Sequence, residues 1–286
     1  MFPATSRVGN STICSSIVCG SELFVLDAGR GLLALGAAMR DDARFRQIRR
    51  VHVFVSHAHL DHWEGLKDVD WFWKPDNGLD VRIWGTREAL QAIRRGFAHP
   101  SYVPLEVLAR GTTAALRFQA LKAWQSKAIG DWQLETFPLH HYSGIGREKR
   151  LLDTLGFRLT GPGGVRVAYV CDHEPIASTR AMERSILQGT HLAIIDAHFS
   201  SIVDHCFGHG SQEHAAGLAR QHPDTLILAS HLAPMLTDTE LHAARRRYAN
   251  GVANYKLAHE TSNWRWNERL ERFVPGPKTG AQAGKR

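Results

Sequence analysis

The sequence predicts a layered α/β domain in which two sheets are flanked by helices. Short β-branched or apolar runs alternate with helix-patterned stretches along the chain, and no long linker interrupts the alternation. The 286 residues are 43% apolar and 22% charged, which is an ordinary globular composition. We therefore expect one domain over residues 1–274. Residues 275–286 lack periodicity and are expected to form a flexible tail.

The first half of the chain is predicted to begin with a hairpin, because two β-rich runs flank Gly20-Ser21. A stretch with helical spacing of apolar residues follows, and strands then alternate with helices. The expected strands are 16–19, 22–26, 51–56 and 81–84, and the expected helices are 31–40, 62–72 and 87–95.

The second half is predicted to contain two hairpins and then helix-strand units. Gly130-Asp131 is the expected turn within a strand-rich section, residues 116–139. Gly-Pro-Gly-Gly at 161–164 is a strong turn signal between two apolar strands within 155–172. The expected helices are 178–188, 212–221 and about 239–248, and the expected strands between them are 192–195 and 225–229.

Composition narrows the class of protein. No apolar run approaches the ~20 residues of a bilayer span, and no secretory signal is visible, so we expect a cytoplasmic protein. The four cysteines lack C-x-x-C spacing and suit neither a disulfide framework nor a zinc knuckle. The formal charge of +7 is mildly basic and is typical of a solvated basic surface with no partner; the alternative is that it helps to attract an anionic substrate. The unusual feature is the 17 histidines.

Polar residues directly follow four of the predicted strands: His57, Asp172, Asp196 and His231. One such residue alone is more often a cap or a surface group. In open α/β sheets, however, ligands bind outside the carboxyl ends of the strands. Four at equivalent positions therefore predict a shared site.

The densest cluster is His57-Ala58-His59-Leu60-Asp61-His62. His57 and His59 are two residues apart in an extended turn, so both can face one metal. Asp61 and His62 are expected in the first turn of the next helix, directed at a second position. The alternative is that Asp61 caps that helix and the histidines are exposed. The crowding favours a divalent cation, Zn²⁺ first and Mn²⁺ or iron next.

The H-A-H-L-D-H segment resembles the H-x-H-x-D-H signature of the metallo-β-lactamase superfamily. Gly9–Thr12 with Phe24–Gly29 is similar to the opening hairpin of its phosphodiesterase-like branch, which includes ribonuclease Z and cyclic phosphodiesterases. The resemblance implies a four-layer αβ/βα sandwich with a two-metal site at its edge. It implies the following ligands: His57, His59 and a histidine of 138–141 for the first metal, Asp61, His62 and His231 for the second, and Asp172 as the bridge.

The third ligand of the first metal is either His140 or His141, since strand alternation puts the two on opposite faces. The family motif favours His141, with His140 behind it. Gly208-His209-Gly210-Ser211 is similar to the branch's His-Ser-Thr type motif. That resemblance implies that His209 stabilises or protonates the leaving group, with Asp196 orienting it. We assign no role to His173, His198 or His205.

Two adjacent cations would share a water and hold it as a bridging hydroxide, which makes hydrolysis the natural chemistry. The predicted catalytic residues are His209 as general acid and the ligand Asp61. A phosphodiester bond in a small or nucleotide-type substrate is the first hypothesis. A carboxylic ester, lactone or thioester hydrolase is the second. A metal-binding biosynthetic or partner-binding protein without turnover is the third.

The expected partner is a small, anionic substrate. A large RNA is disfavoured because the sequence shows no basic, Gly/Pro-rich arm. No membrane contact is expected, and a homodimer is the oligomeric state to be tested.

Overall fold

The computed structural model describes residues 11–69, 71–73, 78–110, 115–144, 146–201, 207–260 and 262–276. They fall into two compact units, Ser11–Lys122 (the N-terminal unit) and residues 123–276 (the C-terminal unit). The organisation as one domain over residues 1–274 stays a prediction. Gly9, Asn10, His205 and most of the predicted tail lie outside the described residues.

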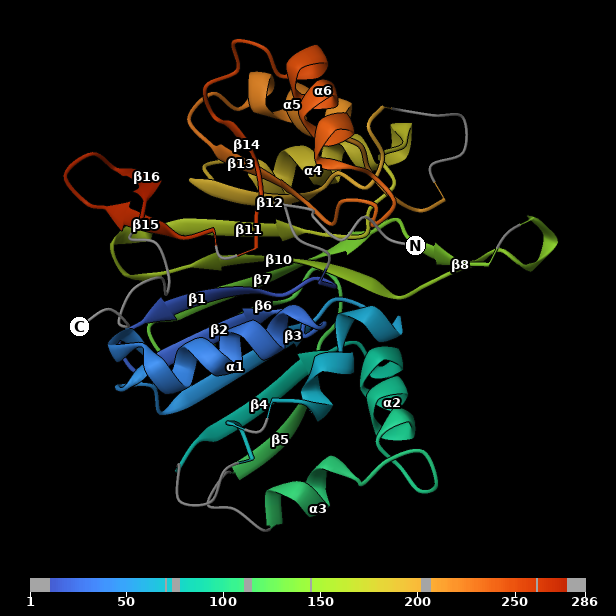
Figure 1. Ribbon diagram of the computed structural model, residues 1–286, viewed down its shortest axis with the longest axis vertical. Coiled ribbons are helices and arrows are strands. Elements are labelled where there is room, and N and C mark those ends of the chain that lie inside the picture. Colours follow the sequence, from blue (N-terminus) through green and yellow to red (C-terminus); the bar gives the residue numbers. More distant parts are fainter. Residues whose placement is uncertain are drawn as a thin grey trace. The chain divides into compact units, whose positions relative to one another are not determined.

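The N-terminal unit is built on a five-stranded sheet with the strands in sequence order (Figure 1). The first two strands form the predicted hairpin, in which Cys19 pairs with Glu22, and the remaining pairs are parallel. The strands are β1 (Ser15–Cys19), β2 (Glu22–Leu26), β3 (Arg50–Val55), β4 (Asp80–Gly85) and β5 (Ala115–Ala120).

Three helices bury their apolar sides against this sheet: α1 (Gly31–Asp41), α2 (Arg87–Gly96) and α3 (Leu105–Arg110). Side chains alternate along a strand, so Val51, Val53 and Val55 of β3 join the helix-facing core. His52 and Phe54 take the opposite face, where they are also buried and stack on each other. Helix α3 was not predicted.

The predicted helix at 62–72 is wrong. The chain instead forms two short 3₁₀ helices there, η2 (Leu60–His62) and η3 (Glu64–Lys67). The cause lies in where the backbone groups bond: the His62 carbonyl accepts from the Ala28 N–H at 2.8 Å, and the Gly65 N–H donates to the Ala28 carbonyl at 2.9 Å. These bonds to the loop after β2 replace the i to i+4 ladder of an α-helix.

The C-terminal unit contains a seven-stranded sheet in the order β14-β13-β12-β11-β10-β7-β6. The pairs from β14 to β11 are parallel, and those from β11 to β6 are antiparallel. The strands are β6 (Ser126–Ile129), β7 (Trp132–Leu139), β10 (Thr154–Thr160), β11 (Arg166–Val170), β12 (Leu192–Asp196), β13 (Leu226–Ser230) and β14 (Tyr255–Leu257).

Helices α4 (Arg180–Leu187), α5 (Gln212–Gln221) and α6 (Asp238–Tyr248) lie together on one face of this sheet (Figure 1). A capping box between Thr237 and Glu240 begins α6. The predicted hairpin around Gly161 and the three predicted helices are confirmed. β14 was not predicted.

Two small hairpins complete the C-terminal unit. They are β8 (Tyr142–Ser143) with β9 (Arg150–Leu151), and β15 (Trp264–Asn267) with β16 (Arg272–Pro275). Because β16 reaches Pro275, and the Gly276 N–H donates to the Asn263 carbonyl, these two residues of the predicted tail belong to a hairpin. The remaining 3₁₀ helices are η1 (Ala43–Phe45), η4 (Gly146–Glu148), η5 (Pro162–Gly164) and η6 (Ala177–Thr179).

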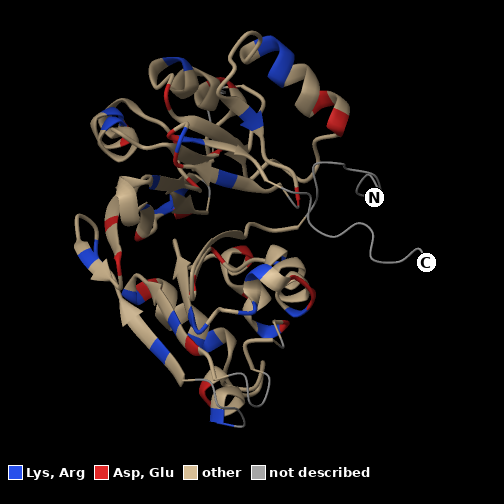
Figure 2. Cartoon of the chain, turned by 90° about the vertical axis from the view of Figure 1, so that its left-hand side faces the viewer, with Lys and Arg blue, Asp and Glu red and all other residues tan. Residues whose placement is uncertain are grey.

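Lysine and arginine are interspersed with aspartate and glutamate along both units in the view of Figure 2. In that view the positively charged residues are therefore spread over both units and do not gather in one patch. The longest helices in the described parts of the chain have 11 residues, and none is long and apolar enough to cross a bilayer.

Candidate metal centre

The histidine-rich loop of the N-terminal unit begins one residue after β3 ends. His57 and His62 are fully buried, His59 is half-buried, and the Asp61 side chain is 40% exposed. The ring centroids of His57 and His59 are 4.7 Å apart, and those of His57 and His62 are 4.2 Å apart. The 3₁₀ turn Leu60–His62 thus brings three imidazoles and one carboxylate into a single short segment.

Asp27, just after β2, holds this loop in place through hydrogen bonds to Ser56 and His62. It is completely buried and has a φ of 55°, a left-handed conformation that is uncommon for a residue other than glycine. Its carboxylate accepts from the Ser56 N–H at 2.7 Å, the Ser56 hydroxyl at 2.8 Å and His62 Nδ1 at 2.7 Å.

These bonds fix which ring nitrogen of two histidines carries the proton. An ionised carboxylate only accepts, so His62 Nδ1 must donate to Asp27. The single hydroxyl proton of Ser56 goes to Asp27, so Ser56 Oγ accepts from His57 Nδ1 at 3.0 Å. In their neutral forms both rings then carry the lone pair on Nε2, which is the form a metal requires.

In the C-terminal unit, the predicted strand-end residues do come together. β11, β12 and β13 are parallel, so Asp172, Asp196 and His231 meet at one edge. Asp172 Oδ1 lies 3.3 Å from His231 Nε2, and Asp172 Oδ2 lies 3.3 Å from His141 Nε2. Asp172 and His231 both have a φ of 54°, and such conformations cluster at functional sites.

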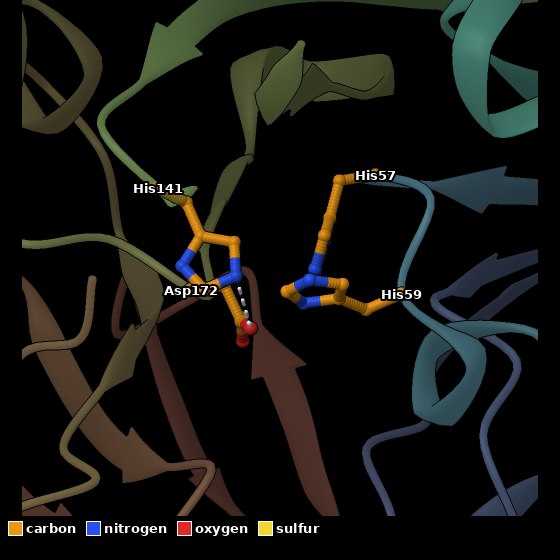
Figure 3. A group of neighbouring side chains, drawn as sticks. All are labelled: His57, His59, His141 and Asp172. Atoms are coloured by element: carbon orange, nitrogen blue, oxygen red, sulfur yellow. Dashed lines mark ion pairs between the residues drawn. The ribbon is translucent and has the colours of Figure 1, made fainter. Parts of the chain in front are cut away.

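Figure 3 draws two side chains from each unit: His57 and His59 from the first, His141 and Asp172 from the second. The dashed line in Figure 3 is the contact between His141 and Asp172. Asp172 is 1% exposed and is placed between two imidazole Nε2 atoms of its own unit. Each carboxylate oxygen of Asp172 therefore faces a different imidazole.

His140 and His141 follow the end of β7 and point to different places. His140 Nδ1 lies 3.3 Å from Glu174 Oε2, and burial lowers the pKa of His140 more than this carboxylate raises it. His141 Nδ1 lies 2.7 Å from the Gly208 carbonyl, which can only accept, so His141 also presents Nε2. A Cβ on Gly208 would lie 2.7 Å from His141 Nδ1, and its φ is 83°, so this position requires glycine.

Asp196 holds the predicted acid, His209. Asp196 Oδ2 lies 3.1 Å from His209 Nδ1 and accepts from the Gly210 N–H at 3.0 Å. Burial raises the pKa of Asp196, but the charge and the hydrogen bond of His209, together with the charge of His231, outweigh this and bring the pKa to about 2. Burial lowers the pKa of His209, but the Asp196 carboxylate outweighs this and raises it.

His209 lies in a cluster of three imidazoles that contact one another. The ring centroid of His209 is 4.4 Å from that of His198 and 5.1 Å from that of His231, and the centroids of His198 and His231 are 5.3 Å apart. Burial and the neighbouring His209 lower the pKa of His198 to about 4. The donor atoms of Asp172, Asp196, His209 and His231 all lie within 4.8 Å of one another.

The sequence did not reveal the residues that orient these groups. Asp27, Ser56 and Gly208 were given no role of their own, although each contacts a predicted ligand. For Asp27 and Ser56 the available signal is position, since both come directly after a buried apolar strand. Gly208 gives no comparable signal, because its contact with His141 spans 67 residues of sequence.

The donor set of each unit suits a divalent cation. Histidines with defined Nε2 lone pairs and buried or half-exposed carboxylates, with no cysteine among them, are typical ligands of Zn²⁺ and similar ions. Orienting contacts to the outer ring nitrogens are usual at such sites, and His57, His62 and His141 each have one.

The comparisons with known proteins agree with this chemistry. Residues 23–232 match the family model described as the beta-lactamase superfamily domain. The chain therefore belongs to the metallo-β-lactamase superfamily, as predicted, and has its mixed α/β fold. Among curated proteins, none matches the chain.

Solved structures of the same fold share little sequence with this chain. A diphosphatase of the PhnP family is 17% identical, with a TM-score of 0.57 over 87% of this chain and 81% of that one. Zn²⁺-bound PqqB from Methylobacterium extorquens is 13% identical, with a TM-score of 0.58 over 89% and 95%. The short form of human tRNase Z is 15% identical, with a TM-score of 0.52 over 82% and 89%. Family and site together support a metal-dependent hydrolase.

Proposed function

We propose that the two groups of ligands together hold two divalent cations, and that the protein hydrolyses phosphodiester bonds in a small or nucleotide-type substrate. The family model spans both groups, since it covers residues 23–232. The proposed ligands are His57, His59 and His141 for the first cation, Asp61, His62 and His231 for the second, and Asp172 for both.

The observation that carries this proposal is the position of Asp172. Its two oxygens each lie 3.3 Å from a different imidazole Nε2, so one carboxylate can serve two cations. Seven ligands are also too many for a single tetrahedral site. Zn²⁺ is the proposed metal, with Mn²⁺ or iron as the alternatives.

Two cations bound here would supply an activated water and neutralise the negative charge that develops on the substrate. The chain's own acid is His209. Because its Nδ1 donates to Asp196, its Nε2 is the nitrogen that can give a proton to the departing oxygen. Asp196 stabilises the charged imidazole and holds the ring in place, and its own position is fixed by the His173 and Gly210 N–H groups.

A phosphodiester substrate is favoured because its alkoxide leaving group needs such an acid. An aromatic surface beside His209 supports the nucleotide-type substrate. The Phe199 ring centroid lies 6.5 Å from that of His209 and 6.4 Å from that of Phe207, which is 52% exposed. An exposed aromatic ring can stack on a nucleobase. We also propose that the substrate is anionic and that the protein acts in the cytoplasm.

The test is to reconstitute the protein with Zn²⁺, Mn²⁺ or Fe²⁺ and to measure bound metal by elemental analysis. The loaded protein is then assayed on phosphodiesters, phosphomonoesters, carboxylic esters, lactones and thioesters. We expect close to two ions per chain and turnover of small diesters. Turnover confined to esters, lactones or thioesters would replace the phosphodiester assignment. Two bound ions with no turnover would instead support a metal-binding protein.

A further inference from the structure

Glu183, His173 and His214 form a buried polar network that contacts the backbone of His140, next to His141. The proposed chemistry does not use this network. Glu183 on α4 is 5% exposed, and its Oε1 lies 3.0 Å from His173 Nε2 and 3.2 Å from His214 Nε2 on α5. His173 follows Asp172 directly and is 3% exposed. Burying a carboxylate is costly unless it is paired and hydrogen-bonded, and His173 and His214 supply these contacts to Glu183.

The network determines the protonation of His173. The His140 backbone N–H donates to His173 Nδ1 at 3.0 Å, so Nδ1 must be the unprotonated nitrogen. The proton is then on Nε2, where it is donated to Glu183. Glu183 therefore selects the one tautomer of His173 that can accept from the main chain of His140.

This bond is half of a clamp between two segments that carry proposed ligands. The His140 N–H is held by His173, and the His140 carbonyl accepts from the Glu174 N–H at 2.8 Å. His173 and Glu174 directly follow Asp172, and His141 directly follows His140. The clamp thus ties the backbone beside His141 to the backbone beside Asp172.

We propose that the Glu183–His173 pair is a positioning device that sets the separation of His141 and Asp172 for metal binding. The inference rests on the proposed function, because it needs a metal at these two residues. His214 contacts the same carboxylate oxygen but no part of residues 140–141 in the described contacts, so it offers a matched control within the network.

The test compares Zn²⁺ affinity, measured by competition with a chromophoric chelator, across five variants. His173→Leu removes the acceptor for the His140 N–H, whereas His173→Asn keeps an oxygen near the position of Nδ1. Glu183→Leu removes the acceptor for His173, whereas Glu183→Gln keeps one. His214→Gln perturbs the same carboxylate without touching the clamp.

We expect His173→Leu and Glu183→Leu to weaken Zn²⁺ binding by about 10–100-fold, the usual effect of losing a group that orients a ligand. His173→Asn, Glu183→Gln and His214→Gln should stay within a few-fold of wild type. Nitrogen-15 NMR of the metal-free protein gives a second readout. His173 Nδ1 should be unprotonated in wild type and Glu183→Gln, and this signature should be lost in Glu183→Leu.

The outcomes separate the two ideas. If wild type binds no metal, the proposed function fails first. If wild type binds Zn²⁺ and both leucine variants bind it equally well while remaining folded by circular dichroism, the positioning role is wrong. Equal weakening by His214→Gln and Glu183→Leu would also overturn it, because the network would then act only through stability. If one leucine variant fails to fold, the Zn²⁺ affinity of the other decides. If both fail, the tautomer of His173 in the wild type decides: an unprotonated Nδ1 supports the positioning role, and a protonated Nδ1 overturns it.

Discussion

The two ligand groups are built in opposite ways. In the N-terminal unit, four ligand-type residues lie within six positions, and one buried carboxylate, Asp27, orients the loop through two hydrogen bonds to Ser56 and one to His62. In the C-terminal unit, His141, Asp172 and His231 each follow a different strand. His141 and the acid His209 are oriented by different partners, Gly208 and Asp196.

This difference predicts which substitutions should disturb the ligands of each group. The N-terminal group depends on local backbone geometry, so a change at its single support should affect several ligands together. The C-terminal group depends on the register of neighbouring strands, and within it Asp172 contacts both His141 and His231. Substitutions at these two kinds of position should give different patterns of metal loss.

The largest effect is expected from Asp172→Ala. Removing the carboxylate shared by His141 and His231 should cost one metal ion and nearly all activity. Asp61→Ala, in the N-terminal loop, should chiefly empty the second site, because Asp61, whose side chain is 40% exposed, is proposed as a ligand of that ion alone. Elemental analysis and hydrolysis of an activated diester measure both effects. Retention of two ions in Asp172→Ala would show that Asp172 is not the bridge.

The next effect separates two neighbouring residues of the C-terminal group. His141→Ala should strip metal, because His141 Nε2 faces Asp172. His140→Ala should retain it, since the His140 side chain faces Glu174 and its backbone N–H still donates to His173. The metal content of the two purified variants decides the point. Loss of metal in His140→Ala would move the proposed ligand by one residue.

The comparison also explains what the sequence could and could not predict. The H-A-H-L-D-H segment is visible because its residues are adjacent, and the strand-end residues are visible because buried apolar runs precede them. The helix predicted at 62–72 failed because the backbone of His62 and Gly65 bonds to Ala28, a partner 34 or more residues away in sequence. The role of Glu183 could not be predicted for a similar reason. Its position on its own helix is that of an ordinary charged residue, and its partners His173 and His214 lie on other segments.

The catalytic role of His209 can be tested without disturbing the ligands. A leaving group such as p-nitrophenolate needs no proton, whereas the alkoxide of a nucleotide diester does. His209→Ala should therefore reduce turnover of the unactivated diester by roughly 10²–10⁴-fold, and of the activated one far less. Metal content should be unchanged. Equal losses on the two substrates would remove the role as general acid.

A smaller effect is expected at the support of the N-terminal loop. Asn tolerates the left-handed conformation of residue 27, but its amide nitrogen cannot accept from His62 Nδ1. Asp27→Asn should weaken binding at the second site by about 10–100-fold while leaving His141 and Asp172 in place. Ser56→Ala is the matched control, because it removes a partner of His57 and keeps the bond from His62 to Asp27. Calorimetric Zn²⁺ titration should resolve the two sites, and unchanged affinity in Asp27→Asn would show that the loop holds His62 without this bond.

The last prediction concerns the free energy of unfolding at low pH. Acid should change the stability of the C-terminal unit clearly and should have the smallest effect on the site. Burial raises the pKa of Glu183, but the hydrogen bonds from His173 and His214 outweigh this and bring it to about 2, below the ordinary value of 4.5. A carboxyl group with a lowered pKa stabilises the fold fully above pH 4.5, and this contribution disappears as the pH falls towards 2. The difference in free energy of unfolding between wild type and Glu183→Gln should therefore shrink by about 3 kcal/mol between pH 6 and pH 2, at about 1.4 kcal/mol for each unit of pKa. Urea unfolding of the two metal-free proteins at a series of pH values measures it. Parallel curves for the two proteins across this range would show that Glu183 does not carry its charge into the folded state.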